Sequence, residues 1–106
     1  MVLGSPGGAR IIPTVTQVIS NVIDYNMNIQ DAIDAYRMYD NTKNKIIYEG
    51  GLTNNTLIKL TSMGHKVEKY EEGYNKHFGG VQGIEYKDNK IIGGADSRRD
   101  GKALAN

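Results

Sequence analysis

The chain has 106 residues, of which 39% are hydrophobic and 24% are charged, and its formal net charge at pH 7 is +1. This length predicts a single domain over residues 1–106 with a modest core, and the balanced charge argues against nucleic acid or an anionic membrane as a partner. Because cysteine is absent, disulfides, thiolate metal sites and cysteine nucleophiles are excluded.

The N-terminal residues do not resemble a targeting signal. They lack the basic flank and the apolar run of a signal peptide, and no stretch approaches the ~20 apolar residues that span a bilayer. Met1-Val2-Leu3 is a short apolar run before a glycine turn, as at the end of a strand. We therefore expect the sequence to begin within a strand of a longer polypeptide.

Apolar residues recur at helical spacing between Ala9 and about Tyr25, which predicts an amphipathic helix. Pro13 fits only near the first turn of a helix, where its missing N–H would have no partner, so the helix should start close to Gly8. The positions expected to face the core are Ile11, Ile12, Val15, Val18, Ile19, Val22 and Ile23.

A second helix is predicted directly after Met27. Asn28 is a suitable N-cap, and Asp31 lies at the third helical position, where an acidic residue supports the cap. This helix should end before Asp40. The residues expected to point inward are Ile29, Ala32, Ile33 and Tyr36.

Residues 44–51 are typical of a short strand closed by glycines, and residues 66–70 are typical of another. Between them the sequence predicts a helix that is capped by Thr53 or Asn54 and stopped by Gly64 in the left-handed C′ position. The residues that this helix should bury are Leu57, Leu60 and Met63.

Residues 81–87 and 90–96 flank Asp88-Asn89 and predict a β-hairpin with a tight turn. The tail, residues 97–106, has too little apolar content to form an element. The expected fold class is α+β, with helices packed on one side of a small, mostly antiparallel sheet. Such a sheet would leave unpaired edges, which something else should cover.

A glycine-rich turn, Gly4-Ser5-Pro6-Gly7-Gly8, lies between the first strand and the first helix. The first N–H groups of a helix are free and its dipole is positive at that end, so such a turn can hold an anion or the oxyanion of an acyl-transfer intermediate. On spacing alone, the pattern favours an ordinary tight turn over such a site. It matches neither a P-loop nor a dinucleotide-binding fingerprint.

Four segments carry a resemblance to a known family. They are residues 4–11 (GSPGGARI), 22–32, 64–67 (GHKV) and 94–103, and they occur in the family's order over nearly the whole chain. The sequence resembles the C-terminal part of the small subunit of γ-glutamyltranspeptidase.

The resemblance implies a fragment of an N-terminal-nucleophile hydrolase, an αββα sandwich that cleaves itself and exposes a threonine as nucleophile and base. In that family the two glycines of the Ser-Pro-Gly-Gly turn provide the oxyanion hole through their backbone N–H groups, and here they would be Gly7 and Gly8. The substrates implied are glutathione-like or poly-γ-glutamyl compounds, and bacterial members are typically exported. No cofactor is expected, and His65 and His77 are expected in surface or packing roles rather than at a metal.

The nucleophile of the family opens a Thr-Thr-His-like motif upstream of this turn, and the residues that grip the glutamyl α-carboxylate and α-amine lie upstream as well. No threonine of this chain precedes a histidine. We therefore expect the chain to be inactive alone and to need an upstream γ-glutamyltranspeptidase polypeptide as its partner. The alternatives are a non-catalytic remnant that forms homo-oligomers through exposed sheet edges, and a small anion-binding protein that uses the same turn.

Two positions depart from the family's pattern, since Tyr36 and Ser97 stand where proline is usual. These departures indicate a divergent member. Charged residues cluster near the second departure and are expected to pair with one another in a solvated turn. They are Asp96, Arg98, Arg99 and Asp100.

Overall fold

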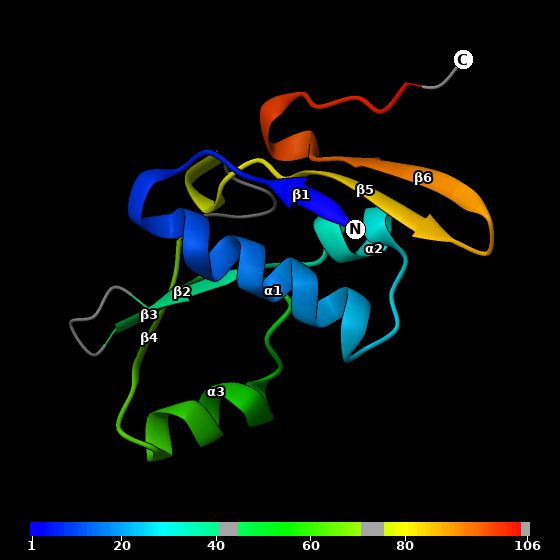
Figure 1. The fold of residues 1–106 in the computed structure, drawn as a ribbon. Coiled ribbons are helices and arrows are strands. Elements are labelled where there is room, and N and C mark those ends of the chain that lie inside the picture. The colour runs from blue at the N-terminus through cyan, green and yellow to red at the C-terminus, as the bar shows by residue number, and fades with distance from the viewer. Residues whose placement is uncertain (41–44, 71–75, 105–106) are drawn as a thin grey trace.

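The computed structural model describes residues 1–40, 45–70 and 76–104. Within these ranges the chain forms three α-helices and two small sheets (Figure 1). The α+β class is confirmed, whereas the expectation of one sheet is wrong, because the central strands form a sheet of their own. Among the described residues no helix is long and apolar enough to cross a membrane.

The first sheet contains β1 (Val2–Gly4), β5 (Gln82–Lys87) and β6 (Lys90–Ala95) in the order β1-β5-β6, and both pairs are antiparallel. The predicted N-terminal strand and the predicted hairpin are therefore confirmed. Asp88 and Asn89, with φ of 52° and 62°, form the tight turn between β5 and β6.

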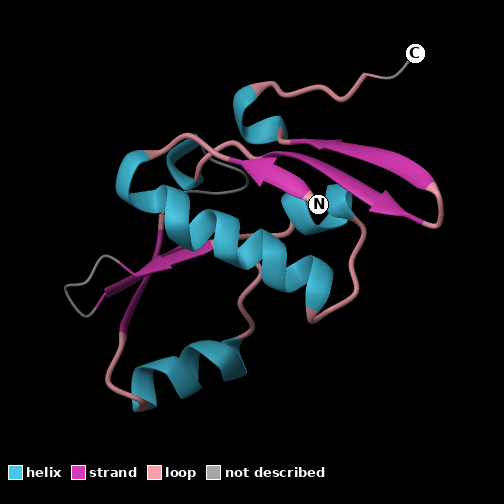
Figure 2. Cartoon of the chain, viewed as in Figure 1, coloured by secondary structure: helices cyan, strands magenta, loops and turns pink. Residues whose placement is uncertain are grey.

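Helices α1 (Ile11–Ile23) and α2 (Ile29–Asp34) lie on one side of this sheet (Figure 2), and a short 3₁₀ turn at Gly8–Arg10 leads into α1. Gly83 and Gly94 pair across β5 and β6, and a Cβ on Gly94 would lie only 2.8 Å from Cδ1 of Ile33. This pair lets α2 approach the strands closely. The buried core consists of Val18, Ile29, Ala32, Ile33 and Val81.

The second sheet contains β2 (Met38–Asp40), β3 (Lys45–Tyr48) and β4 (Lys66–Lys69). β2 and β3 are antiparallel, whereas β3 and β4 are parallel and are connected through α3 (Asn54–Ser62). Two of these strands match the predicted ones, and β2 was not predicted.

The predicted helix boundaries depend on caps, and the structure confirms them. The side chain of Asn28 accepts a hydrogen bond from the Asp31 amide at 2.8 Å, and that of Thr53 accepts one from the Thr56 amide at 3.2 Å. Gly64 has φ +94°, and the amides of Gly64 and His65 bond back to the last turn of α3. This is the Schellman ending of a helix.

Several predicted core positions are wrong. Helix α2 ends at Asp34, because the Arg37 amide donates to the buried Glu49 carboxylate at 2.8 Å and turns the chain into β2, so Tyr36 is 51% exposed. Only Val18 of the seven apolar positions on α1 is fully buried, and Ile12 is 77% exposed. Helix α3 buries none of its residues, so Leu57 and Leu60 are only partly buried and Met63 is 72% exposed.

Candidate functional site

The Ser5-Pro6-Gly7-Gly8 turn connects β1 to the start of α1. Gly7 has φ +136° and Gly8 has φ +60°, backbone conformations that side-chain-bearing residues rarely adopt. The carbonyl of Gly7 accepts a hydrogen bond from the Arg10 amide at 3.2 Å, which closes the first 3₁₀ turn. The two glycines therefore set the direction in which the chain enters the helix.

The amides of this turn are available to an external acceptor. Neither Gly7 nor Gly8 donates its N–H to another group in the part of the chain that the structure describes. Gly8 is exposed, and a Cβ placed on it would meet nothing within 4 Å. The turn thus combines free donors, a helix start and open space, which are the requirements of a site for negative charge.

A buried segment, residues 78–81, lies against the inner side of the turn. The Gly80 amide donates to Ser5 Oγ at 3.1 Å, and the Ser5 hydroxyl in turn donates to the Pro6 carbonyl at 2.8 Å. Gly79 is so close that a Cβ on it would lie 2.5 Å from Ser5 Oγ. Thr14, on α1, donates to the Phe78 carbonyl at 3.1 Å.

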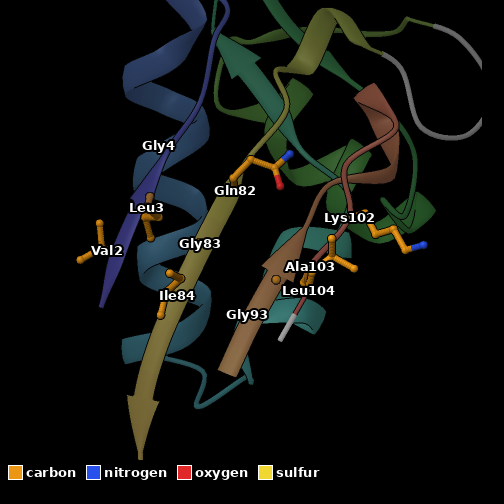
Figure 3. Close-up of a pocket in the computed structure, with 11 residues that line it drawn as sticks. Val2, Leu3, Gly4, Gln82, Gly83, Ile84, Gly93, Lys102, Ala103 and Leu104 are labelled. Atoms are coloured by element: carbon orange, nitrogen blue, oxygen red, sulfur yellow. The ribbon is translucent and has the colours of Figure 1, made fainter. Parts of the chain in front are cut away.

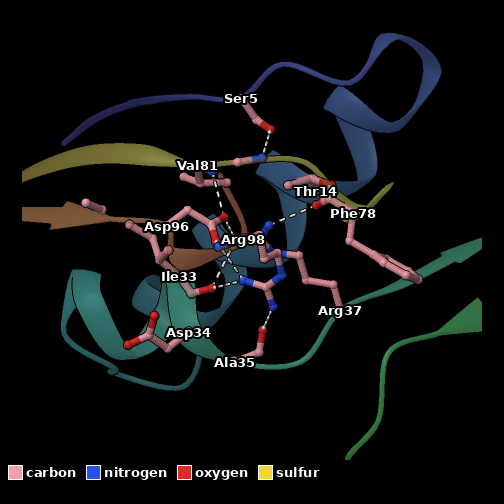
Figure 4. A network of polar contacts seen from close by, with 12 residues as sticks. Ser5, Thr14, Ile33, Asp34, Ala35, Arg37, Phe78, Val81, Asp96 and Arg98 are labelled. Carbon is pink, nitrogen blue, oxygen red and sulfur yellow. Dashed lines mark hydrogen bonds and ion pairs between the residues drawn. The ribbon is translucent and has the colours of Figure 1, made fainter. Parts of the chain in front are cut away.

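Buried charged side chains lie on the other side of this segment, and Figure 4 shows three of them, Arg37, Asp96 and Arg98. The Arg98 guanidinium forms a bidentate pair with Glu49, both N–O distances being 2.6 Å, and a further contact of 3.1 Å with Asp96. Asp96 also pairs with Arg37 at 2.8 Å. We call these residues the buried ion network: Arg37, Glu49, Asp96 and Arg98.

Backbone groups satisfy much of the remaining hydrogen-bonding capacity of the network. Asp96 accepts from the amides of Val81 and Arg98 at 2.8 and 2.9 Å. Arg37 donates to the carbonyl of Phe78 at 2.8 Å, and Arg98 donates to that of Ala35 at 2.9 Å. The network therefore fixes the backbone on both sides of Gly79 and Gly80.

The protonation of Asp96 follows from these contacts. Burial by itself raises the pKa of the Asp96 carboxyl, but the amides of Arg98 and Val81 and the two guanidinium groups together hold that pKa below its ordinary value. Burial by itself lowers the pKa of the Arg98 guanidinium, but the hydrogen bonds that it donates to Glu49 and Asp96 and the negative charges of these carboxylates raise that pKa above its ordinary value. Asp96 is therefore ionised at neutral pH.

The expectation that the C-terminal charges pair in a solvated turn is confirmed for the pair of Asp96 with Arg98 and is wrong about its solvation. Asp96 and Arg98 are buried, while Arg99 and Asp100 are exposed, and a 3₁₀ turn at Ser97–Arg99 forms where no element was expected. Sequence reasoning missed Arg37 and Glu49 altogether. Two buried arginines require carboxylate partners from other elements, and this requirement is the clue that could have led to both residues.

Tyr36 and Ser97, which stand where the family usually has proline, fit into the structure while the buried ion network remains intact. The Tyr36 ring packs over Gly51, whose Cβ position lies 2.8 Å from Cδ2 of the ring. Ser97 is exposed at the start of its 3₁₀ turn.

His77 stacks on Tyr70 with ring centroids 4.4 Å apart, which is a packing role. His65 follows Gly64 at the end of α3. Within the described ranges no group of three or more histidines and carboxylates is placed to hold a metal ion.

A separate groove of about 480 Å³ lies on the outer face of the first sheet, opposite the helices (Figure 3). The C-terminal segment 102–104 forms one wall, and Val2 and Ile84 lie on the strands that form its floor. Its lining includes neither Gly7 nor Gly8, so it is distinct from the turn.

The family model for γ-glutamyltranspeptidase matches residues 1–106. The chain belongs to the γ-glutamyltranspeptidase family. It is 37% identical to the glutathione hydrolase proenzyme of Bacillus subtilis (strain 168) over an alignment 106 positions long that covers 98% of this chain and 17% of that protein. The chain therefore spans about a sixth of the length of this relative.

Solved structures of the γ-glutamyltranspeptidase family have the same fold. The enzyme from Pseudomonas nitroreducens matches with a TM-score of 0.81 and 29% identity, over 99% of this chain and 54% of that one. The transpeptidase enzyme CapD of Bacillus anthracis matches with a TM-score of 0.82 and 32% identity, over 98% of this chain and 62% of that one. The N-terminal-nucleophile hydrolase fold implied by the sequence is thereby confirmed for this segment.

Proposed function

We propose that this chain is the C-terminal portion of a γ-glutamyltranspeptidase that transfers or hydrolyses γ-glutamyl groups of glutathione-like substrates. Gly7 and Gly8 are its oxyanion donors. The threonine nucleophile comes from another polypeptide segment, so this chain alone is inactive. The observation that supports this function best is the Gly7-Gly8 turn, with two unbonded amides and open space at the start of α1.

The chemistry assigned to the turn is charge stabilisation. When a threonine hydroxyl attacks the γ-glutamyl carbonyl, the new C–O bond forms, the threonine proton passes to the base, and the carbonyl oxygen becomes negative. The N–H groups of Gly7 and Gly8 donate to that oxygen, and the positive end of the helix adds to the field. As the intermediate collapses, the C–N bond breaks, the base returns its proton to the departing amine nitrogen, and the acyl-enzyme remains.

The need for a partner polypeptide has support in the relatives and on the surface. The B. subtilis relative is named a proenzyme, and this chain covers 17% of it. Exposed apolar residues occur on α1 and on the outer face of the first sheet, among them Ile12, Val2 and Ile84. A polypeptide that carries the nucleophile would cover such surfaces.

A second candidate is a non-catalytic module that associates with itself. It is favoured by the exposed apolar side chains of the hairpin, Tyr86 at 66% and Ile91 at 75%, and by the edge strands β1 and β6. Edges of this kind pair readily with a second copy. This candidate predicts stable homo-oligomers without γ-glutamyl chemistry.

The decisive test substitutes the glycines in an assembled enzyme. This chain would replace the segment that it matches in the B. subtilis glutathione hydrolase, and turnover of a γ-glutamyl anilide would be measured. Gly7→Ala and Gly8→Ala should each lower kcat by about a hundredfold, because both force a side-chain-bearing residue into a left-handed conformation and displace an oxyanion donor.

Gly4→Ala is the matched control for the glycine variants. Gly4 lies in the same segment, its φ is outside the left-handed region, and a Cβ on it would meet nothing within 4 Å. It should keep kcat within about twofold. Equal activity of all three variants would show that the glycines are not oxyanion donors.

A further inference from the structure

The hydroxyl of Ser5 connects the Gly7-Gly8 turn to the buried segment 78–81. It accepts the hydrogen bond of the Gly80 amide at 3.1 Å and donates to the carbonyl of Pro6 at 2.8 Å. Pro6 directly precedes Gly7, so one side chain bonds both to the turn and to a segment 75 residues further along the chain.

Segment 78–81 is held in place independently of Ser5. Its Phe78 carbonyl accepts hydrogen bonds from Thr14 and Arg37, and its Val81 amide donates to Asp96. Arg37 and Asp96 are buried and paired with each other at 2.8 Å. The segment is therefore a rigid support with fixed backbone groups on both sides of its two glycines.

The contact between this support and the turn is also steric. A Cβ on Gly79 would lie 2.5 Å from Ser5 Oγ and 3.3 Å from the Pro6 carbonyl oxygen, and Cα of Gly79 lies 3.8 Å from the Cβ position of Gly7. The backbone of Gly79 thus fills the space directly behind the turn. The Ser5 hydroxyl is the polar group that fixes the turn at that distance.

We propose that Ser5 is a positioning residue for the oxyanion donors: through its bond to Gly80 it holds the Gly7-Gly8 turn against segment 78–81. This inference rests on the proposed function. It adds that the rigidity of the site originates in the buried ion network and reaches the turn through one serine hydroxyl. Loss of that hydroxyl leaves the Gly80 amide without its acceptor and lets the turn shift.

The test uses the same chimeric enzyme with Ser5→Ala, Ser5→Thr and the control Ser62→Ala. Ser62 is exposed on α3, and its hydroxyl donates to the Lys59 carbonyl of its own helix. Ser5→Ala should lower kcat about tenfold with KM within about twofold, because misplacement affects the transition state more than substrate binding. Ser5→Thr, which keeps a hydroxyl, should recover most of kcat.

A second readout separates positioning from a general loss of structure. A γ-glutamyl boronic acid forms a tetrahedral adduct with the nucleophile and so reports on the oxyanion donors. Its Ki should rise about tenfold in Ser5→Ala, in proportion to the loss of kcat, while the thermal midpoint of the enzyme changes little.

The outcomes separate the two proposals. If Gly8→Ala lowers kcat but Ser5→Ala leaves kcat and Ki unchanged, the role of Ser5 is overturned and the proposed function stands. If the fall in kcat of Ser5→Ala is accompanied by a matching fall in the thermal midpoint of the enzyme, general destabilisation explains the loss. That result would also overturn the positioning role. An active chimera in which Gly8→Ala has no effect would overturn the proposed function.

Discussion

The single carboxylate of Asp96 takes part in several buried contacts at once. It is fully buried and pairs with Arg37 and Arg98. It also accepts a hydrogen bond from the Val81 amide, so it joins the C-terminal 3₁₀ turn to segment 78–81 behind the glycines. Removing one member of a buried ion network leaves the opposite charges uncompensated in a medium where they are poorly solvated. The cost of such a change exceeds that of losing one surface pair.

We predict that Asp96→Asn destabilises the chain by about 3 kcal/mol at pH 6, measured by urea unfolding. The folded pKa of Asp96 lies below its ordinary value, so its contribution is fully present above that ordinary value and is lost as the pH falls through the folded pKa. The difference between the two proteins should therefore shrink below about pH 4. Asp100→Asn, at the exposed end of the same 3₁₀ turn, is the control, and a difference that grows towards low pH would refute the assignment.

The glycine turn could be predicted from the sequence, whereas the buried ion network could not. The turn at Gly7 and Gly8 could be predicted because glycines with positive φ before a helix leave a local pattern of residues, whereas their role as oxyanion donors is implied by the family resemblance and stays a prediction. Glu49 and Arg98 are 49 residues apart, and nothing local to either predicts that they meet. The buried ion network is a product of tertiary packing, which the spacing of residues does not encode.

At the scale of elements, the boundaries with a local chemical cause were predictable. Asn28, Thr53 and Gly64 each satisfy free backbone groups of a helix end and do so in the structure. Strand β2 was missed because Arg37, just before it, is held by Glu49 from beyond β3. Helix propensity favoured a longer α2, and the buried contact overrode it.

The ending of α3 gives a direct prediction at this scale. Gly64→Ala should weaken the last turn of the helix by about 1 kcal/mol, because alanine resists a φ of +94° although its Cβ would meet nothing within 4 Å. Hydrogen exchange of the Met63 and His65 amides measures the opening of that turn. Gly64→Asn, which tolerates this conformation better, should lose less, and equal protection in all three proteins would rule out the strain.

At the scale of the whole molecule, one face of the first sheet exposes large apolar side chains. Val2, Ile84 and Ile91 on the outer face of the first sheet are all more than half exposed, while helices cover the opposite face. An isolated 106-residue domain would bury such a face. The match covers 54% of the solved P. nitroreducens chain, so that protein has residues beyond the matched segment.

Release of the chromophore from a γ-glutamyl anilide tests whether this chain needs a nucleophile from another polypeptide. The samples are this chain alone, a nucleophile-bearing polypeptide from the B. subtilis relative without the matching segment, and the two produced together. We expect activity only when both are present. Release by the chain alone would contradict the absence of a nucleophile, and silence of all three would favour the self-associating module over a catalytic role.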